Sequence, residues 1–186
     1  MFTGCVRSMP VQYYQLSSVR EDGVHAEFPV PKKASIGLGP LRLPEYLDRP
    51  QIVSRSSVNR LILSDSQRWA EPLAENMMRV LSEDLAELLG TDRILLHPWN
   101  RDRVVDCQIT VEVLQFEGGP DDTVNLIARW QVIGKDGQIL LPERRSSFSM
   151  TASAGQDQEA MVVALSQGLL RLAREIAAAL PPLLAH

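Results

Sequence analysis

The sequence has few of the residues from which most metal sites and nucleophilic active sites are built. Its 186 residues include only three histidines and two cysteines. His25, His97 and His186 stand at no metal-ligand spacing with one another or with a cysteine. A Gly-x-Ser-x-Gly motif is also absent. We therefore expect a protein that is not an enzyme and that carries no cofactor and no metal.

A surplus of positive charge and long apolar runs are missing as well. The chain has 19 Lys and Arg against 23 Asp and Glu, a formal net charge of -4. This balance argues against a surface that binds nucleic acid. No uninterrupted apolar run approaches the roughly 20 residues that a transmembrane helix needs. Hydrophobic residues make up 45% of the chain, enough for one complete core, so we expect a single domain.

Two segments have the apolar periodicity of long amphipathic helices, residues 69–89 and residues 157–180. Asp65 and Ser66 are candidate caps for the first helix, and Gly90 is a natural stop. The expected core faces are Leu73, Met77, Val80, Leu81, Leu85 and Leu88 in the first helix, and Met161, Leu165, Leu169, Leu172, Ile176 and Leu180 in the second.

Alternation of apolar and polar residues predicts strands over residues 105–113, 124–132 and 144–151, and a shorter one over 58–63. The Asp136-Gly137 pair indicates a hairpin turn. Strands in this order form an antiparallel meander. We therefore predict an α+β fold, a two-layer sandwich in which both long helices pack on one face of a mostly antiparallel sheet.

Five short motifs, spread over most of the chain, resemble the PqiC/YmbA family. They are Tyr13-Tyr14-Gln15-Leu16, Leu43-Pro44-Glu45-Tyr46-Leu47, Gln51-Ile52-Val53, Trp69-Ala70-Glu71-Pro72-Leu73 and Arg129-Trp130. Members of this family are auxiliary lipoproteins of MCE-type (PqiABC) lipid transport systems in Gram-negative envelopes. The resemblance thus implies a non-catalytic envelope protein.

The first residues, Met1-Phe2-Thr3-Gly4-Cys5, lack the charged start and apolar run of a secretory signal. A small residue before a cysteine is nevertheless typical of the end of a lipoprotein processing box. The resemblance makes Cys5 the candidate lipidation site, and Val6 in place of an acidic residue favours the outer membrane by analogy. We therefore divide the chain into a tether, residues 1–12, and a domain, residues 13–186. Cys107 lies on an alternating strand and is expected to be a buried free thiol.

Several aromatic and apolar residues lie near prolines. Because proline cannot donate to a sheet, residues 44–50 are predicted to be an exposed edge or loop. An exposed group of this kind could bind a partner or a hydrophobic ligand, whereas the alternative is that these side chains complete the core. The candidate partner-binding residues are Tyr13, Tyr14, Pro44, Tyr46, Leu47 and Trp69.

The first functional hypothesis is a periplasmic lipoprotein anchored in the outer membrane through acylated Cys5. By resemblance it would bind a PqiB-like MCE-domain tunnel protein and help lipids cross the periplasm. The second hypothesis is a carrier that holds one acyl chain between helices and sheet, which needs an open apolar cavity of ~300 Å³ or more. A pilotin-like chaperone is a third option. A homo-oligomer is compatible with each of them, and no nucleic acid is expected as a partner.

Overall fold

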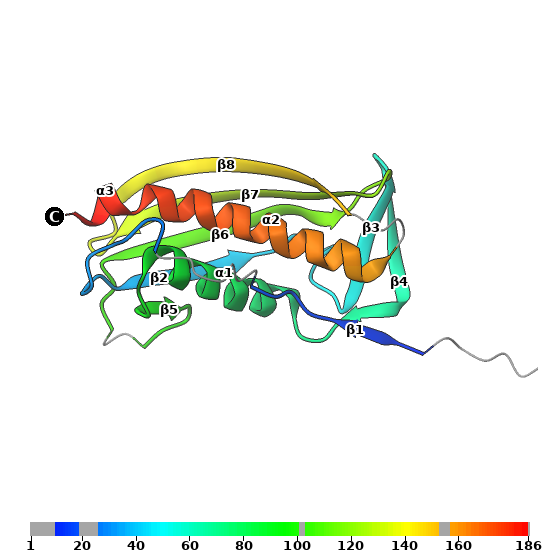
Figure 1. The fold of residues 1–186 in the computed structure, drawn as a ribbon, viewed down its shortest axis with the longest axis horizontal. Coiled ribbons are helices and arrows are strands. Elements are labelled where there is room, and N and C mark those ends of the chain that lie inside the picture. The colour runs from blue at the N-terminus through cyan, green and yellow to red at the C-terminus, as the bar shows by residue number, and fades with distance from the viewer. Residues whose placement is uncertain (1–9, 19–25, 101–102, 153–156, 186) are drawn as a thin grey trace, which may run out of the picture.

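A computed structural model describes residues 10–18, 26–100, 103–152 and 157–185. Eight strands and three helices follow one another along this part of the chain (Figure 1). Their bounds are β1 (Gln12–Tyr14), β2 (Ile36–Arg42), β3 (Gln51–Ser57), β4 (Arg60–Trp69), α1 (Leu73–Leu89), β5 (Ile94–Leu96), β6 (Cys107–Gly118), β7 (Thr123–Gly134), β8 (Ile139–Thr151), α2 (Gln158–Ala179) and α3 (Pro181–Leu184).

Most of the paired residues in the described sheet are antiparallel, as predicted, but the sheet is mixed, because four of its strand pairs are parallel. Strands β6, β7 and β8 form the expected antiparallel meander. Strand β2, however, pairs with β6 in parallel, and β5 pairs with β2 in parallel. At the far end of β6, Gly118 pairs with Ser54 of β3, which continues the sheet into the β3–β4 hairpin and β1.

The two long helices lie on one face of the sheet, as predicted (Figure 1). Helix α2 packs against β6, β7 and β8, while α1 packs against β2, β5 and α2. The structure is nevertheless no simple two-layer sandwich. The sheet curls into a half-barrel, and the β3–β4 hairpin closes one end (Figure 1). A register shift between Val113 and Gln115 of β6 marks a bulge just before this end, and bulges increase local twist.

The core faces of both helices were predicted correctly in the main. Met77, Val80, Leu81 and Leu85 of α1 are fully buried, and Leu165 of α2 is 1% exposed. Leu169, Leu172, Ile176 and Leu180 are buried as well, whereas Met161 is only partly buried. Cys107 is a buried free thiol, as expected.

Helix α1 begins at Leu73 and not at Trp69, and the two candidate caps were wrong. Asp65 and Ser66 lie within β4, and Trp69 is the last residue of that strand. Pro72 takes the cap position without a side-chain hydrogen bond. Because a proline disfavours helical conformation in the residue before it, the helix cannot start earlier. Gly90 ends α1 with φ 65°, the left-handed conformation that glycine adopts readily.

The predicted strand over residues 58–63 covers only the start of β4. Val58 lies in the turn between β3 and β4, and β4 continues to Trp69. The pairs Ser57–Arg60 and Val53–Leu63 place this turn at the tip of an antiparallel hairpin. Neither a glycine nor a proline marks the turn, which explains why the sequence pattern did not separate the two strands.

Candidate functional site

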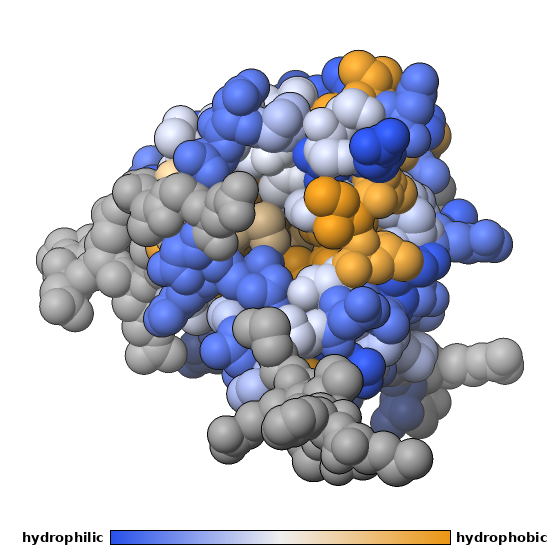
Figure 2. Space-filling model, turned by 90° about the vertical axis from the view of Figure 1, so that its right-hand side faces the viewer, coloured by the Kyte–Doolittle hydropathy of each residue, from blue (hydrophilic) through white to orange (hydrophobic). Residues whose placement is uncertain are grey.

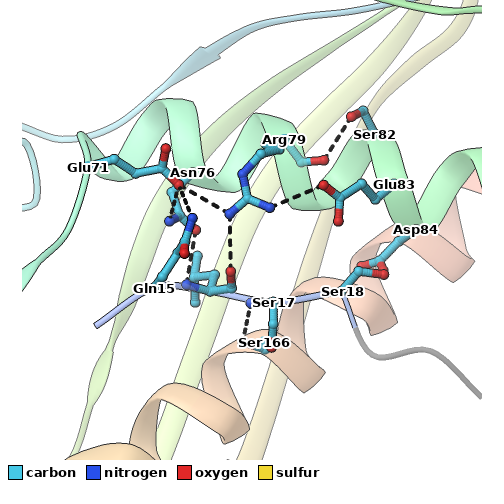
Figure 3. Close-up of polar contacts among 11 residues, drawn as sticks. Gln15, Ser17, Ser18, Glu71, Asn76, Arg79, Ser82, Glu83, Asp84 and Ser166 are labelled. Atoms are coloured by element: carbon cyan, nitrogen blue, oxygen red, sulfur yellow. Dashed lines mark hydrogen bonds and ion pairs between the residues drawn. The ribbon is translucent and has the colours of Figure 1, made fainter. Parts of the chain in front are cut away.

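The chain that follows β1 lies between α1 and α2 and is held there by polar side chains of both helices (Figure 3). Asn76 of α1 is fully buried, and its Oδ1 accepts a hydrogen bond of 3.1 Å from the backbone N–H of Leu16. The Asn76 Nδ2 donates to Glu71 Oε1 at 2.5 Å. On the other side, the Ser166 hydroxyl of α2 accepts from the N–H of Ser17 at 3.3 Å.

Arg79 completes this attachment on α1. Its guanidinium donates to the carbonyl of Leu16 at 3.3 Å, to Glu71 at 3.1 Å and to Glu83 at 3.1 Å. Hydrogen bonds from Gln15 and Arg79 hold the pKa of the Glu71 carboxyl below its usual value. Both backbone groups of Leu16 are therefore fixed to a helix, which makes residues 15–17 a rigid connection between the N-terminal segment and the core.

Asp84 is a second buried polar group in this region. It is 2% exposed, and the Ser18 hydroxyl donates to its Oδ1 at 2.6 Å. Within the described residues, its Oδ2 has no hydrogen-bond partner. Burial raises the pKa of the Asp84 carboxyl from 3.8 to about 6. The charged form is thus disfavoured in the folded protein.

This pKa predicts that the Asp84→Asn variant is more stable than the wild type at pH 8, by about 1–3 kcal/mol. Between pH 4 and 6 the folded protein retains the Asp84 proton that the unfolded chain has released, so stability falls as pH rises. The asparagine variant should lack this loss. Thermal unfolding at pH 5 and pH 8 measures how much stability each protein loses as the pH rises. Asp92→Asn, at an exposed position, is the control. Equal pH dependence in both variants would contradict the prediction.

A buried ion pair holds the loop between β2 and β3. Glu117 of β6 is fully buried, and its Oε1 accepts from Arg55 Nε at 2.7 Å. The Tyr46 hydroxyl donates to Glu117 Oε2 at 2.6 Å. Burial, followed by the nearby Glu117 carboxylate, raises the pKa of the Tyr46 phenol. The three side chains join the loop, β3 and the end of β6, so Tyr46 has a structural role.

The candidate partner-binding residues lie near one another but differ in exposure. Tyr14 pairs with Trp69 across β1 and β4, and the N–H of Trp69 donates to the carbonyl of Pro50 at 2.8 Å. Tyr13 is 64% exposed, whereas Tyr14, Pro44 and Tyr46 are half-buried. Leu47 and Trp69 are in the core, at 2% and 5% exposure.

Residues 44–50 form a loop and no strand edge, which agrees with one of the two predicted forms, but the loop is not exposed throughout, because Leu47 is buried. The segment is a turn, and the N–H of Leu47 donates to the carbonyl of Pro44 at 2.9 Å, which directs the Leu47 side chain into the core. In this conformation a partner can reach Tyr13 and parts of Tyr14, Pro44 and Tyr46, but not Leu47 or Trp69. Cys5 lies outside the described residues.

A cavity of about 440 Å³ lies between the β3–β4 hairpin and the start of α2. Ile62, Gly118, Asp122 and Met161 are among the residues that line it, so its wall is both polar and apolar. The carrier hypothesis needs an apolar cavity between helices and sheet. This cavity lies between α2 and the sheet but has a partly polar wall, whereas α1 presents fully buried side chains, including Met77.

Two negative observations apply to residues 10–18, 26–100, 103–152 and 157–185. They contain no group of three or more His, Cys, Asp and Glu side chains that could hold a metal ion. None of their helices combines the length and the apolar character that crossing a membrane requires.

Comparison with known proteins identifies one family. The family described as "ABC-type transport auxiliary lipoprotein component" matches residues 14–177. This match confirms the resemblance to PqiC/YmbA-like proteins. The matched range includes four of the five motifs in full, and the first motif without its first residue, Tyr13. Comparison with the curated proteins gives no significant match.

Solved structures share the fold. A Xanthomonas campestris protein of family DUF330 is 13% identical with a TM-score of 0.76, and the alignment covers 93% of this chain and 96% of that one. An uncharacterized protein is 21% identical with a TM-score of 0.74, over 92% of this chain and 99% of that one. A hypothetical protein from Chlamydia trachomatis is 12% identical with a TM-score of 0.51, over 83% and 99% of the two chains.

Proposed function

The chain belongs to the family of ABC-type transport auxiliary lipoprotein components, and on this premise we propose that it is a non-catalytic subunit of an MCE-type, PqiABC-like lipid transport system. In this proposal acylated Cys5 anchors it to the inner leaflet of the outer membrane. The domain then holds a PqiB-like MCE-domain tunnel protein at that membrane. The family match over residues 14–177 is the observation that carries the proposal.

The attachment of residues 15–17 supports the anchoring role. Leu16 is bonded through both its N–H and its carbonyl to side chains of α1, and Ser17 is bonded to α2. A lipid on Cys5 would therefore be connected to the core through a short tether and a fixed segment. Several acyl chains bind a bilayer firmly, whereas one chain alone is marginal.

Fractionation of the native gene product tests the anchor. The wild type is expected in the outer-membrane fraction, with an intact mass that includes the acyl chains. Cys5→Ser should move the protein to the soluble periplasmic fraction, because the bond to the lipid cannot form. Cys107→Ala is the matched control, since Cys107 is a buried free thiol, and this variant should stay with the membrane. Release of both variants, or of neither, would contradict the proposed anchor.

The partner is tested separately by capture of the MCE-domain protein with acylated protein. We propose that the accessible candidate residues contribute to this contact, and Tyr13 is the most exposed of them at 64%. Tyr13→Asp should weaken capture without lowering the melting temperature, because the side chain packs little against the core. Lys33→Asp, a change at another exposed position, serves as the control. If acylated wild-type protein captures no MCE-domain protein, this part of the proposal fails.

A further inference from the structure

An apolar patch lies on the end of the molecule that the β3–β4 hairpin closes (Figure 2). We call Val58, Ile62 and Leu63 the hairpin patch. Their side chains are 85%, 49% and 42% exposed. In the described part of the chain, the outer edge of β4 is paired with β1 only over the last three residues, from Gln67 to Trp69. Val58 lies in the hairpin turn, and Ile62 and Leu63 follow on the two faces of β4. Exposed large apolar side chains at one end of the molecule, beside an open strand edge, indicate a contact surface.

The N-terminal segment enters the fold at the same end. Strand β1 is parallel to β4, with Gln12 beside Gln67 and Tyr14 beside Trp69. The chain therefore arrives from the hairpin end, while α3 lies at the opposite end (Figure 1). From Cys5 to Pro10 there are five residue steps, which span at most roughly 18 Å. An acyl chain on Cys5 would keep the hairpin end close to the bilayer surface.

We propose that the hairpin patch rests in the interface of the lipid bilayer and orients the domain on it, an inference that relies on the proposed acylation of Cys5. A lipid surface fits the patch better than a second copy of the chain. Stable protein interfaces bury about 800 Å² on each partner, far more than three partly exposed aliphatic side chains provide. A domain already tethered to the bilayer needs only a weak additional contact, because the anchor supplies a high effective concentration.

The charges around the patch agree with this choice. Arg60 and Asp65 are exposed on β4, and charged side chains on an open strand disfavour pairing with the edge of another copy. Arg60 also lies at the hairpin tip, where it would meet anionic headgroups. Asp121 and Asp122 line the cavity on the α2 side of the same end, together with Ile62, so anionic headgroups would be repelled from that side of the hairpin.

An environment-sensitive dye on single cysteines tests the orientation. The acylated full chain carries the dye at Val58→Cys or, as the matched control, at Val104→Cys. Val104 is 74% exposed and precedes β6, a strand whose other end meets the hairpin. The two positions are therefore separated by about the length of that strand, roughly 36 Å. Burial raises the pKa of the Cys107 thiol to about 12, so the native thiol does not compete for the label.

The labelled proteins are bound to vesicles of phosphatidylethanolamine and phosphatidylglycerol that contain lipid spin-labelled near the headgroup. The dye at position 58 should shift its emission to the blue and be quenched several-fold more strongly than the dye at position 104. Equal quenching on a protein of acylated mass would overturn this inference alone. The inference would also be overturned if the dye at position 58 were shielded from both water and spin label. In that case a second protein, and not the bilayer, would cover the patch. A mass without acyl chains would overturn the proposed anchor, and this inference with it.

Discussion

Replacement of Arg55 by methionine is expected to lower the free energy of unfolding by about 3–5 kcal/mol, because it leaves a buried carboxylate without its cation. Glu117 is 0% exposed, and Arg55 Nε lies 2.7 Å from its Oε1. Methionine keeps much of the apolar stem of arginine, so the change tests the charge more than the packing. The Tyr46 hydroxyl would still donate to Glu117. This neutral hydrogen bond compensates only part of the lost ion pair.

Urea unfolding of the variants measures this effect. Arg129→Met is the matched control, because Arg129 forms ion pairs with Glu112 and Glu143 at the surface. Its replacement should lower the free energy of unfolding by no more than about 1 kcal/mol. The double variant Arg55→Met/Glu117→Gln should recover part of the stability, since no unpaired charge stays buried. If Arg55→Met costs no more than Arg129→Met, the Glu117 pair does not stabilise the fold.

The second large effect is expected for an aspartate in the core of α2. Leu165 is 1% exposed, and Leu165→Asp would place an unpaired carboxylate between helix and sheet. The substitution should lower the free energy of unfolding by several kcal/mol. This is a large part of the total for a typical domain, which is about 5–15 kcal/mol. Met77→Asp, at 0% exposure in α1, should have a similar effect.

Gln167→Asp provides the control for this prediction, because Gln167 is exposed on the same helix two residues further on. Circular dichroism should show that Leu165→Asp melts at a much lower temperature or is unfolded, whereas Gln167→Asp melts close to the wild type. Similar melting temperatures for the two variants would mean that the buried face of α2 is assigned incorrectly.

The sequence was sufficient to predict the elements whose signals are local. The apolar periodicity of α1 and α2 predicted which side of each helix is buried, and Asp136-Gly137 predicted the turn between β7 and β8. The parallel insertion of β2 beside β6 could not be predicted in the same way. Parallel strands are joined by long connections, so no turn motif marks the pairing.

The polar groups of the site escaped prediction for a related reason. Polar residues are normally assigned to the surface, yet Asn76 and Glu117 are fully buried because each finds partners from distant parts of the chain. Glu117 also follows the bulge in β6, which shifts the alternation of inward and outward side chains. Tyr46 was predicted as a candidate partner-binding residue, whereas its structural role depends on contacts with Glu117, which Arg55 also binds.

The attachment of Leu16 to α1 has a mechanical consequence. A pull directed along β1 from its N-terminal end would load the β1–β4 ladder in shear, together with the bonds from Asn76 and Arg79 to Leu16. These bonds would have to break nearly at once and could not open one after another. Tension on the N-terminal segment would therefore be passed to helix α1 and the sheet beneath it. In the proposed arrangement, with Cys5 acylated, this connection would help the domain to keep its partner at the membrane.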